Sequence, residues 1–410
     1  MDLRYSPADE AFREEVRAWL DDAVPDYGPP PPPGDWAARR AYDTGWQRRL
    51  HDGGHAGLHW PTEYGGRGLP ASQQLVFLEE YAAAGAPYVG INFVGTAHAG
   101  PTLIAEGTED QRRRHLPRIL RGDSVWCQGF SEPEAGSDLA SLRTRAVRRG
   151  DEYIVTGQKV WSTRAQVADH CELLVRTDPD APRHRGITWL ILDMDQPGVE
   201  VRPLRTIDGE SHFCEIFLDG ARVPVTNRVG AENDGCRVTN VTLRFERGTA
   251  FAPHIITLRS QLRRLVDLAA TSGTGDDPGL LRQLGRCDAR VDALWRMTQR
   301  CVTEAEAPSK HPAAAPDGQG WRPDRHIQVP SPLGSAVKLG YSELGQEIAE
   351  LGLRLLGRRA LGTTGPDSEA ARVVHDYLWS FQLTIAAGTS QIQRNLIAER
   401  ILGMPKGRRS

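Results

Sequence analysis

The chain has 410 residues, a formal net charge of −3 and a sequence pI near 6.5. A chain of this length exceeds what one hydrophobic core usually holds, so two or three packed units are expected. The nearly balanced charge provides no global field that would recruit nucleic acid or an anionic membrane surface, and neither is predicted as a partner. Two arginine runs, at 112–114 and 358–359, are interpreted as solvated helix faces.

The N-terminal residues lack a basic stretch followed by an apolar one, and no run of about 18 apolar residues occurs in the chain. We therefore expect a cytoplasmic protein without membrane insertion. The six cysteines never occur as C-x-x-C and are too few for a disulfide framework in so long a chain. They are predicted to be reduced core residues.

The first 121 residues carry mainly helical signals. Ser6-Pro7 is typical of an N-cap followed by proline at the first helical position, and the apolar residues that follow recur at helical spacing. Residues 25–34 (PDYGPPPPPG) predict a stiff, polyproline-like connector. Helical periodicity resumes from about residue 36 to 121, and the sequence at 115–117 (HLP) is expected to break a helix.

A change to β character follows residue 122. Short runs of β-branched and aromatic residues, separated by Gly, Pro and Asp, predict an antiparallel β unit. These runs are residues 153–155, 172–175, 187–192 and 215–218. Helical spacing then returns from residue 235 to 402, interrupted at 307–332 by a Pro- and Gly-rich stretch that predicts a long loop, either functional or mobile.

The predicted fold is therefore of the α+β class with three domains. Residues 1–122 form an N-terminal α-helical domain, 123–232 a middle antiparallel β domain, and 233–410 a C-terminal α-helical domain that contains the loop 307–332.

Several motifs are absent, which narrows the chemistry. The sequence has no G-x-G-x-x-G after a strand, no P-loop, no G-x-S-x-G and no H-E-x-x-H, so a Rossmann nucleotide site is not expected. His51, His55 and His59 have the spacing of metal ligands on a helix, but the glycine-rich residues between them favour a turn instead. No metal site is predicted.

Two segments are rich in small and hydroxylic residues. Residues 128–138 and 388–390 combine glycine with Ser or Thr, which suits a ligand with many oxygen acceptors, such as the ribityl chain and pyrophosphate of a flavin. By itself the first segment could equally form a turn-rich hairpin, and an ordinary helix N-cap is the simpler interpretation of the second.

Four motifs together resemble the acyl-CoA dehydrogenase family over nearly the whole chain. They are WPTEYGG at 60–66, FSEPEAGSD at 130–138, GQKVWST at 157–163 and GTSQIQRNLIAERILG at 388–403. The resemblance implies an N-terminal α domain, a middle β domain and a C-terminal four-helix bundle. It also implies FAD-dependent α,β-dehydrogenation of an acyl thioester, of CoA or a carrier protein, to the trans-2-enoyl product, with an electron-transfer flavoprotein as acceptor and a homodimer or tetramer as the assembly.

The resemblance also implies cofactor contacts, with the flavin between the β and C-terminal domains. The residues that match the family's flavin contacts are Gln128, Phe130, Ser131, Ser137, Trp161, Thr163, Thr389 and Gln391. Gln128, Phe130 and Ser131 would line the isoalloxazine, with Trp161 and Thr163 on its other side. Without the motif, Trp161 is interpreted as a core residue.

The catalytic base departs from the commonest family pattern. Many members carry a glutamate directly before the Gly-Thr of the last motif, where this chain has Ala387. Other members place the glutamate on an earlier helix before an arginine, and Glu246-Arg247 matches that arrangement. The resemblance therefore implies that Glu246 takes the α-proton while the β-hydride passes to flavin N5, that Arg247 positions the base or the substrate, and that the Ala387 N–H donates to the thioester carbonyl. Without the resemblance, Glu246 is a surface ion pair.

Two further departures leave the assembly open. The Arg-x-x-Phe-Gly element that reaches a neighbouring subunit's flavin in many relatives is missing from 271–283, where Arg282 could replace its charge. Arg164 stands in place of the asparagine that usually follows Trp-x-Thr. Three alternatives remain: a subunit of a mixed oligomer, as in actinobacterial relatives acting on steroid-like thioesters; a flavin oxidase or N-hydroxylase on the same scaffold; and a non-catalytic binding protein.

Overall fold

The computed structural model describes residues 3–245, 251–271, 276–306, 333–362 and 368–405, which form two compact units. We call residues 11–245 the sheet unit, and the described residues from 251 onwards, with 3–10, the bundle unit. Glu246, Arg247 and the predicted loop 307–332 lie outside the described residues. None of the described helices is both long and apolar enough to cross a bilayer.

Helices precede the sheet along the chain. They are α1 (Pro7–Ala23), α2 (Trp36–Asp52), α3 (Ala71–Ala83), α4 (Gly100–Glu106) and α5 (Glu109–Arg121). The predicted cap of α1 is present, because the Ser6 hydroxyl accepts a hydrogen bond from the Asp9 N–H at 3.2 Å.

The predicted helix break at 115–117 is wrong, because α5 continues through Pro117. A capping box at Thr108 and Gln111 starts this helix, and Gly122 ends it in the left-handed region at φ 73°. One face of α5, including Leu116 and Ile119, is buried. Caps at both ends and a buried apolar face outweigh the one backbone hydrogen bond that proline removes.

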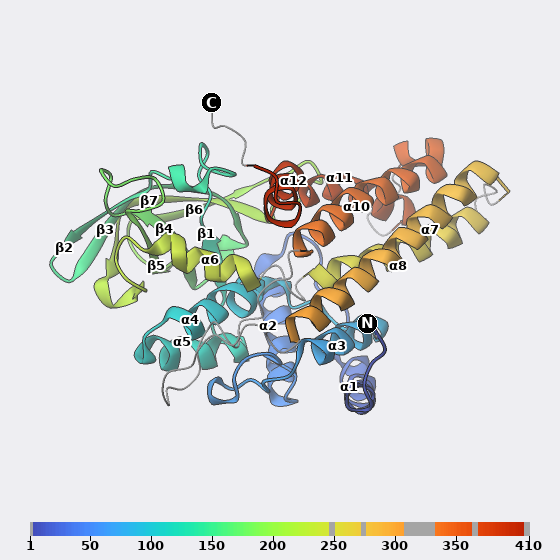
Figure 1. The fold of residues 1–410 in the computed structure, drawn as a ribbon, viewed down its shortest axis with the longest axis horizontal. Coiled ribbons are helices and arrows are strands. Elements are labelled where there is room, and N and C mark those ends of the chain that lie inside the picture. Colours follow the sequence, from blue (N-terminus) through green and yellow to red (C-terminus); the bar gives the residue numbers. More distant parts are fainter. Residues whose placement is uncertain (1–2, 246–250, 272–275, 307–332, 363–367, 406–410) are drawn as a thin grey trace. The chain divides into compact units, whose positions relative to one another are not determined.

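The middle of the chain forms one twisted sheet (Figure 1). Its strands are β1 (Trp126–Gly129), β2 (Arg145–Arg149), β3 (Glu152–Thr163), β4 (His170–Arg176), β5 (Ile187–Asp193), β6 (Val199–Leu204), β7 (Phe213–Pro224) and β8 (Arg228–Val229). The order is β6-β7-β3-β2-β4-β5-β8, with β1 paired to β4. The four predicted strand segments lie within β3, β4, β5 and β7.

The antiparallel prediction holds for most of this sheet, but β4 pairs in parallel with both β1 and β2. The four strands that the sequence did not indicate are short or charged: β2 reads RAVRR and is largely exposed. Helix α6 (Gly235–Phe245) follows β8 and packs against β5 and α4. All six cysteines are free and five of them are buried, in agreement with the prediction that they are core residues.

Among the described residues, the bundle unit contains four long helices and a short fifth, in agreement with the predicted C-terminal helical bundle. They are α7 (Ala252–Thr271), α8 (Pro278–Glu306), α10 (Gly334–Leu356), α11 (Glu369–Leu383) and the short α12 (Ser390–Leu396). Two glycines seven residues apart let α10 approach its neighbours closely. A Cβ on Gly345 would lie 2.9 Å from Leu383 of α11, and one on Gly352 would lie 2.9 Å from Val373 of the same helix.

Candidate active site

Strands β1 and β3 bring two of the sequence motifs together. The Val160 N–H of β3 donates to the Ser131 carbonyl at 3.0 Å, so Ser131 lies next to the bulged end of that strand. Phe130 is only 5% exposed and packs in the core of the sheet unit. Its side chain therefore packs in the core and cannot contact a ligand, whereas its backbone could.

A buried ion pair fixes the segment that carries Ser131. The ammonium of Lys159, which is fully buried, donates to Glu132 Oε1 at 2.8 Å and to the Phe130 carbonyl at 3.2 Å. Glu132 also accepts from the backbone N–H groups of Arg143 and Thr144, at 2.6 and 2.8 Å. The carboxylate thus ties three stretches of chain together.

Burial and the opposite charge of the partner have opposing effects on the pKa values of Glu132 and Lys159. Burial opposes ionisation of Glu132, but the attraction of Lys159 and the hydrogen bonds it accepts outweigh burial and lower its pKa. Burial lowers the pKa of Lys159, and Glu132 offsets part of that effect. A buried ion pair with several hydrogen bonds favours one geometry, because separating the two charges would leave each of them buried without compensation.

Trp161 is the most unusual residue of the site. The register between β3 and β7 shifts between Lys159 and Ser162, and within this bulge Trp161 adopts φ 62°. Its indole is 58% exposed, with the Phe213 ring at 5.9 Å as an edge contact. The interpretation of Trp161 as a core residue is therefore wrong: this large aromatic residue, in a strained conformation, is exposed on the surface of the sheet unit.

Gln128 is oriented by two buried residues that the sequence did not single out. Its Nε2 donates to Glu172 Oε1 at 2.8 Å and lies 3.2 Å from His98 Nδ1. Because a carboxylate only accepts hydrogen bonds, the amide nitrogen must face Glu172 and the amide oxygen must point away from it. The sequence feature that could have indicated this contact is Glu172, an acidic residue in the buried and largely apolar strand β4.

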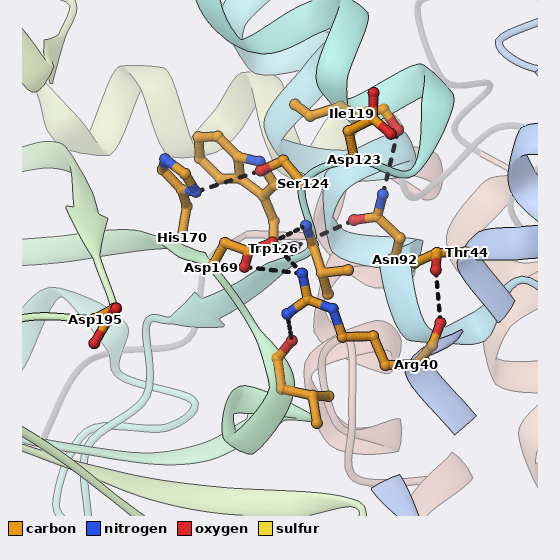
Figure 2. Close-up of polar contacts among 12 residues, drawn as sticks. Arg40, Thr44, Asn92, Ile119, Asp123, Ser124, Trp126, Asp169, His170 and Asp195 are labelled. Atoms are coloured by element: carbon orange, nitrogen blue, oxygen red, sulfur yellow. Dashed lines mark hydrogen bonds and ion pairs between the residues drawn. The ribbon is translucent and has the colours of Figure 1, made fainter. Parts of the chain in front are cut away.

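Polar contacts attach the N-terminal helical region to the start of β1 and to the β3–β4 connection (Figure 2). Arg40 of α2 donates to the Val167 carbonyl at 2.7 Å and to both carboxylate oxygens of Asp169, at 2.7 and 2.8 Å. The Asn92 amide oxygen accepts from the Trp126 N–H, at the start of β1, at 3.2 Å. The ends of β1 and of the β3–β4 connection are thus fixed against helices.

A second group of predicted residues lies on the turn between α11 and α12 in the bundle unit. Ala387 and Gly388 both have left-handed backbone conformations, with φ 53° and 85°. Gln393 Nε2 donates to their two carbonyl groups at 3.1 and 3.3 Å, which holds the turn closed. Thr389 is the N-cap of α12 and accepts from the Ile392 N–H at 3.2 Å, as the N-cap interpretation predicted.

The remaining predicted site residues are exposed or lack a hydrogen-bond partner. Gln391 is exposed on the first turn of α12. Within the described part of the chain, the Ala387 N–H donates no hydrogen bond. Ser137 is exposed on the turn that follows the Glu132–Ala135 bridge in the sheet unit, and Arg282 is exposed on α8.

Domain models of one family match three successive parts of the chain. The N-terminal domain of acyl-CoA dehydrogenase matches residues 6–123, the middle domain 127–221 and the C-terminal domain 233–402. The acyl-CoA dehydrogenase IpdE1 of Mycobacterium tuberculosis is 39% identical over 405 residues, which cover 97% of this chain and 98% of the relative. The chain belongs to the acyl-CoA dehydrogenase family. It is therefore an oxidoreductase of a family whose members are flavoproteins.

Other relatives agree in sequence and in fold. The acyl-CoA dehydrogenase FadE26 of M. tuberculosis is 33% identical over 429 residues, which cover the full length of both chains. Among solved structures, the Tcur3481-Tcur3483 steroid ACAD has a TM-score of 0.80 at 30% identity, covering 99% of this chain and 100% of that one. A chain of the ChsE4-ChsE5 complex from M. tuberculosis has a TM-score of 0.79 at 31% identity, with the same coverage.

Proposed function

We propose that this acyl-CoA dehydrogenase homologue catalyses FAD-dependent α,β-dehydrogenation of an acyl thioester to the trans-2-enoyl product. The observation that carries the proposal is the exposed, strained Trp161 indole on the same bulged strand end as Thr163 and next to Ser131. A planar aromatic surface flanked by hydroxyl groups fits a flavin ring, which needs stacking contacts and donors for its carbonyl and nitrogen acceptors.

The cofactor contacts follow from the groups that the sheet unit leaves available. Ser131, Thr163 and the Gln128 amide would bind the polar edges of the flavin, the Phe130 backbone would support it, and Trp161 would lie against its ring. Ser137, Thr389 and Gln391 are proposed as further contacts. When bound, FAD supplies the acceptor for the substrate's β-hydride, a role that no side chain can fill. An electron-transfer flavoprotein is the proposed final acceptor.

Residues of the chain itself would accept the α-proton and donate a hydrogen bond to the carbonyl oxygen. Glu246 is proposed as the base that takes the α-proton, with Arg247 positioning the base or the substrate. The unused Ala387 N–H is available to donate to the thioester carbonyl, whose oxygen becomes more negative as the α-proton leaves. An oxyanion donor of this kind needs no side chain, so alanine can occupy this position.

The test compares Glu246→Gln with Glu232→Gln under anaerobic conditions. Glu232 is a half-buried carboxylate before α6, ion-paired with Arg228 at 3.5 Å, and serves as the matched control. Both variants should bind FAD. Only in Glu246→Gln should acyl-CoA reduce the flavin, seen as bleaching of its absorbance, more slowly than in the wild type, by roughly 10²- to 10⁴-fold. Adding Ala387→Glu to Glu246→Gln should restore part of that rate. Undiminished bleaching by Glu246→Gln would disprove the assignment of the base.

A mixed oligomer is the second candidate assembly. It is favoured because two of the similar solved structures are named as pairs of proteins, Tcur3481-Tcur3483 and ChsE4-ChsE5. Native mass spectrometry of the chain expressed alone, and then with homologous chains from its own genome, decides between the two assemblies. A stable homo-oligomer with full FAD content and bleaching activity would exclude the mixed form.

A further inference from the structure

A strained backbone position lies in the turn between α11 and α12. Ala387 has φ 53°, in the left-handed region that glycine adopts freely and that the Cβ of alanine makes unfavourable. Among the described residues of the bundle unit, it is the only residue other than glycine with a positive φ. A conformation of this kind persists only where the surrounding contacts hold it.

Gln393 of α12 supplies contacts on one side of this position. It is 3% exposed, and its Nε2 donates to the Ala387 and Gly388 carbonyls at 3.1 and 3.3 Å. Gly388 leaves the space for this approach, because a Cβ there would lie 2.8 Å from Gln393 Nε2. The two hydrogen bonds fix the peptide groups that follow Ala387.

Contacts with α10 fix the residues that precede Ala387. The buried ammonium of Lys338 donates to the Leu383 carbonyl, and Gln346 Nε2 donates to Thr384 Oγ1 at 3.1 Å. The turn is therefore held at both ends. Between them, Ala387 is exposed and its N–H donates no hydrogen bond within the described part of the chain. The unused donor thus belongs to a residue that a ligand can reach.

Gln393 holds the turn at an energetic cost to the fold. With its Nε2 on the two carbonyl groups, its Oε1 is buried and accepts no hydrogen bond from any described residue. A buried acceptor without a partner destabilises the folded state, and an apolar side chain of similar size would avoid that penalty. The contribution of Gln393 that such a side chain could not replace is its pair of hydrogen bonds to the turn.

We propose that Gln393 is a positioning residue for the dehydrogenation, because it keeps Ala387 left-handed and so fixes the direction of the Ala387 N–H. Rotation about the N–Cα bond, which φ measures, sets the direction of this N–H relative to the rest of the turn. A donor that is in place before negative charge develops on an oxygen stabilises that charge without reorganising. The proposal rests on the proposed function, in which the Ala387 N–H donates to the thioester carbonyl.

The test uses the FAD-loaded protein, a series of saturated acyl-CoA thioesters, and the 3-oxo analogue of the thioester that bleaches the flavin fastest. Anaerobic bleaching gives the rate of flavin reduction and its dependence on thioester concentration. The 3-oxoacyl-CoA ionises to an enolate, which gives a long-wavelength charge-transfer band when it stacks on oxidised flavin. A pH titration of this band therefore measures how well the protein stabilises the charged oxygen.

Gln393→Met removes the two donated hydrogen bonds and the unpaired oxygen together. Its bleaching rate at saturating thioester should fall by roughly 10- to 100-fold, with little change in the thioester concentration that gives half of that rate. The pKa of the bound 3-oxoacyl-CoA should rise by about one pH unit, which corresponds to tenfold weaker stabilisation of its enolate. The melting temperature should stay within about 2 °C of the wild-type value, because the lost hydrogen bonds are offset by removal of the unpaired oxygen.

Two further variants separate positioning from a general effect on α12. Adding Ala387→Gly to Gln393→Met should restore part of the rate and lower the pKa of the bound 3-oxoacyl-CoA again, because glycine adopts the left-handed conformation without support. Arg394→Met is the matched control on the same helix. It breaks an exposed ion pair with Glu343 of α10, at 2.6 Å, and should leave both the rate and the pKa unchanged.

Different results overturn different statements. A wild-type rate and a wild-type pKa of the bound 3-oxoacyl-CoA in Gln393→Met, or no recovery on adding Ala387→Gly, disprove the positioning role and leave the dehydrogenase proposal intact. A clear fall in the melting temperature of Gln393→Met shows a structural role instead. A loss of FAD affinity with an unchanged rate at saturating FAD assigns Gln393 to the cofactor contacts and also disproves the positioning role. A wild type that binds FAD but is bleached by no thioester of the series contradicts the proposed function itself.

Discussion

Replacing Glu132 by alanine is expected to destabilise the sheet unit by about 3–5 kcal/mol, the usual penalty for leaving a buried charge without its partner. The variant leaves the fully buried Lys159 ammonium with the Phe130 carbonyl, at 3.2 Å, as its remaining acceptor in the described structure. It also removes the acceptor for the N–H groups of Arg143 and Thr144.

The reverse substitution should be milder. In Lys159→Met the cation is gone, and Glu132 keeps two backbone donors at 2.6 and 2.8 Å, so we expect a loss of only about 1–2 kcal/mol. In the double variant both charges are absent. Its loss should therefore be smaller than the sum of the single losses by about 1–3 kcal/mol.

Urea unfolding of the FAD-free protein measures these differences, and FAD titration measures their consequence for the site. Glu134→Ala is the matched control from the same segment, because the Glu134 side chain is 75% exposed and pairs with Arg143, which is 80% exposed. It should change stability by less than about 0.5 kcal/mol. Equal losses in Glu132→Ala and Lys159→Met, or strictly additive effects in the double variant, would refute the reasoning.

Two further predictions concern a buried histidine and the exposed indole. Burial, together with the charges of His170, Arg114 and Arg118, lowers the pKa of His115 to about 3. Because the unfolded chain then binds more protons than the folded one, stability that is complete above about pH 6.5 should fall as the pH drops towards 3, by up to about 1.4 kcal/mol per pH unit. Urea midpoints at about pH 5 and pH 7.5 measure the slope, and His115→Leu should reduce it without abolishing it, because burial also lowers the pKa of His170; an unchanged slope in that variant would show that His115 does not contribute. Trp161→Ala should leave the melting temperature of the FAD-free protein nearly unchanged but weaken FAD binding by roughly tenfold, since stacking contributes about 0.5–1.5 kcal/mol beyond buried area. Unaltered FAD affinity by fluorescence titration would remove Trp161 from the site.

The parts of the fold that sequence reasoning found are those with strong local signals. The β-branched segments within β4 and β5 and the cap at Ser6 are examples, because neighbouring residues supply the pattern. Strand β2 was not found, since its arginines are typical of a solvated surface and only pairing with β3 makes it a strand. The error at Pro117 has the same origin: burial of one face of α5 outweighs the local effect of proline.

The sequence by itself determined the family, the order of helical and β regions, and the N-cap role of Thr389, whose hydrogen bond reaches only three residues along the chain. Tertiary structure alone decided that Trp161 is exposed, that Glu132 is bonded to Lys159, and that Lys338 donates to the Leu383 carbonyl. These properties depend on strand register and on contacts between residues far apart in sequence. A one-residue shift in a strand turns each side chain to the opposite face, and no local pattern specifies that outcome.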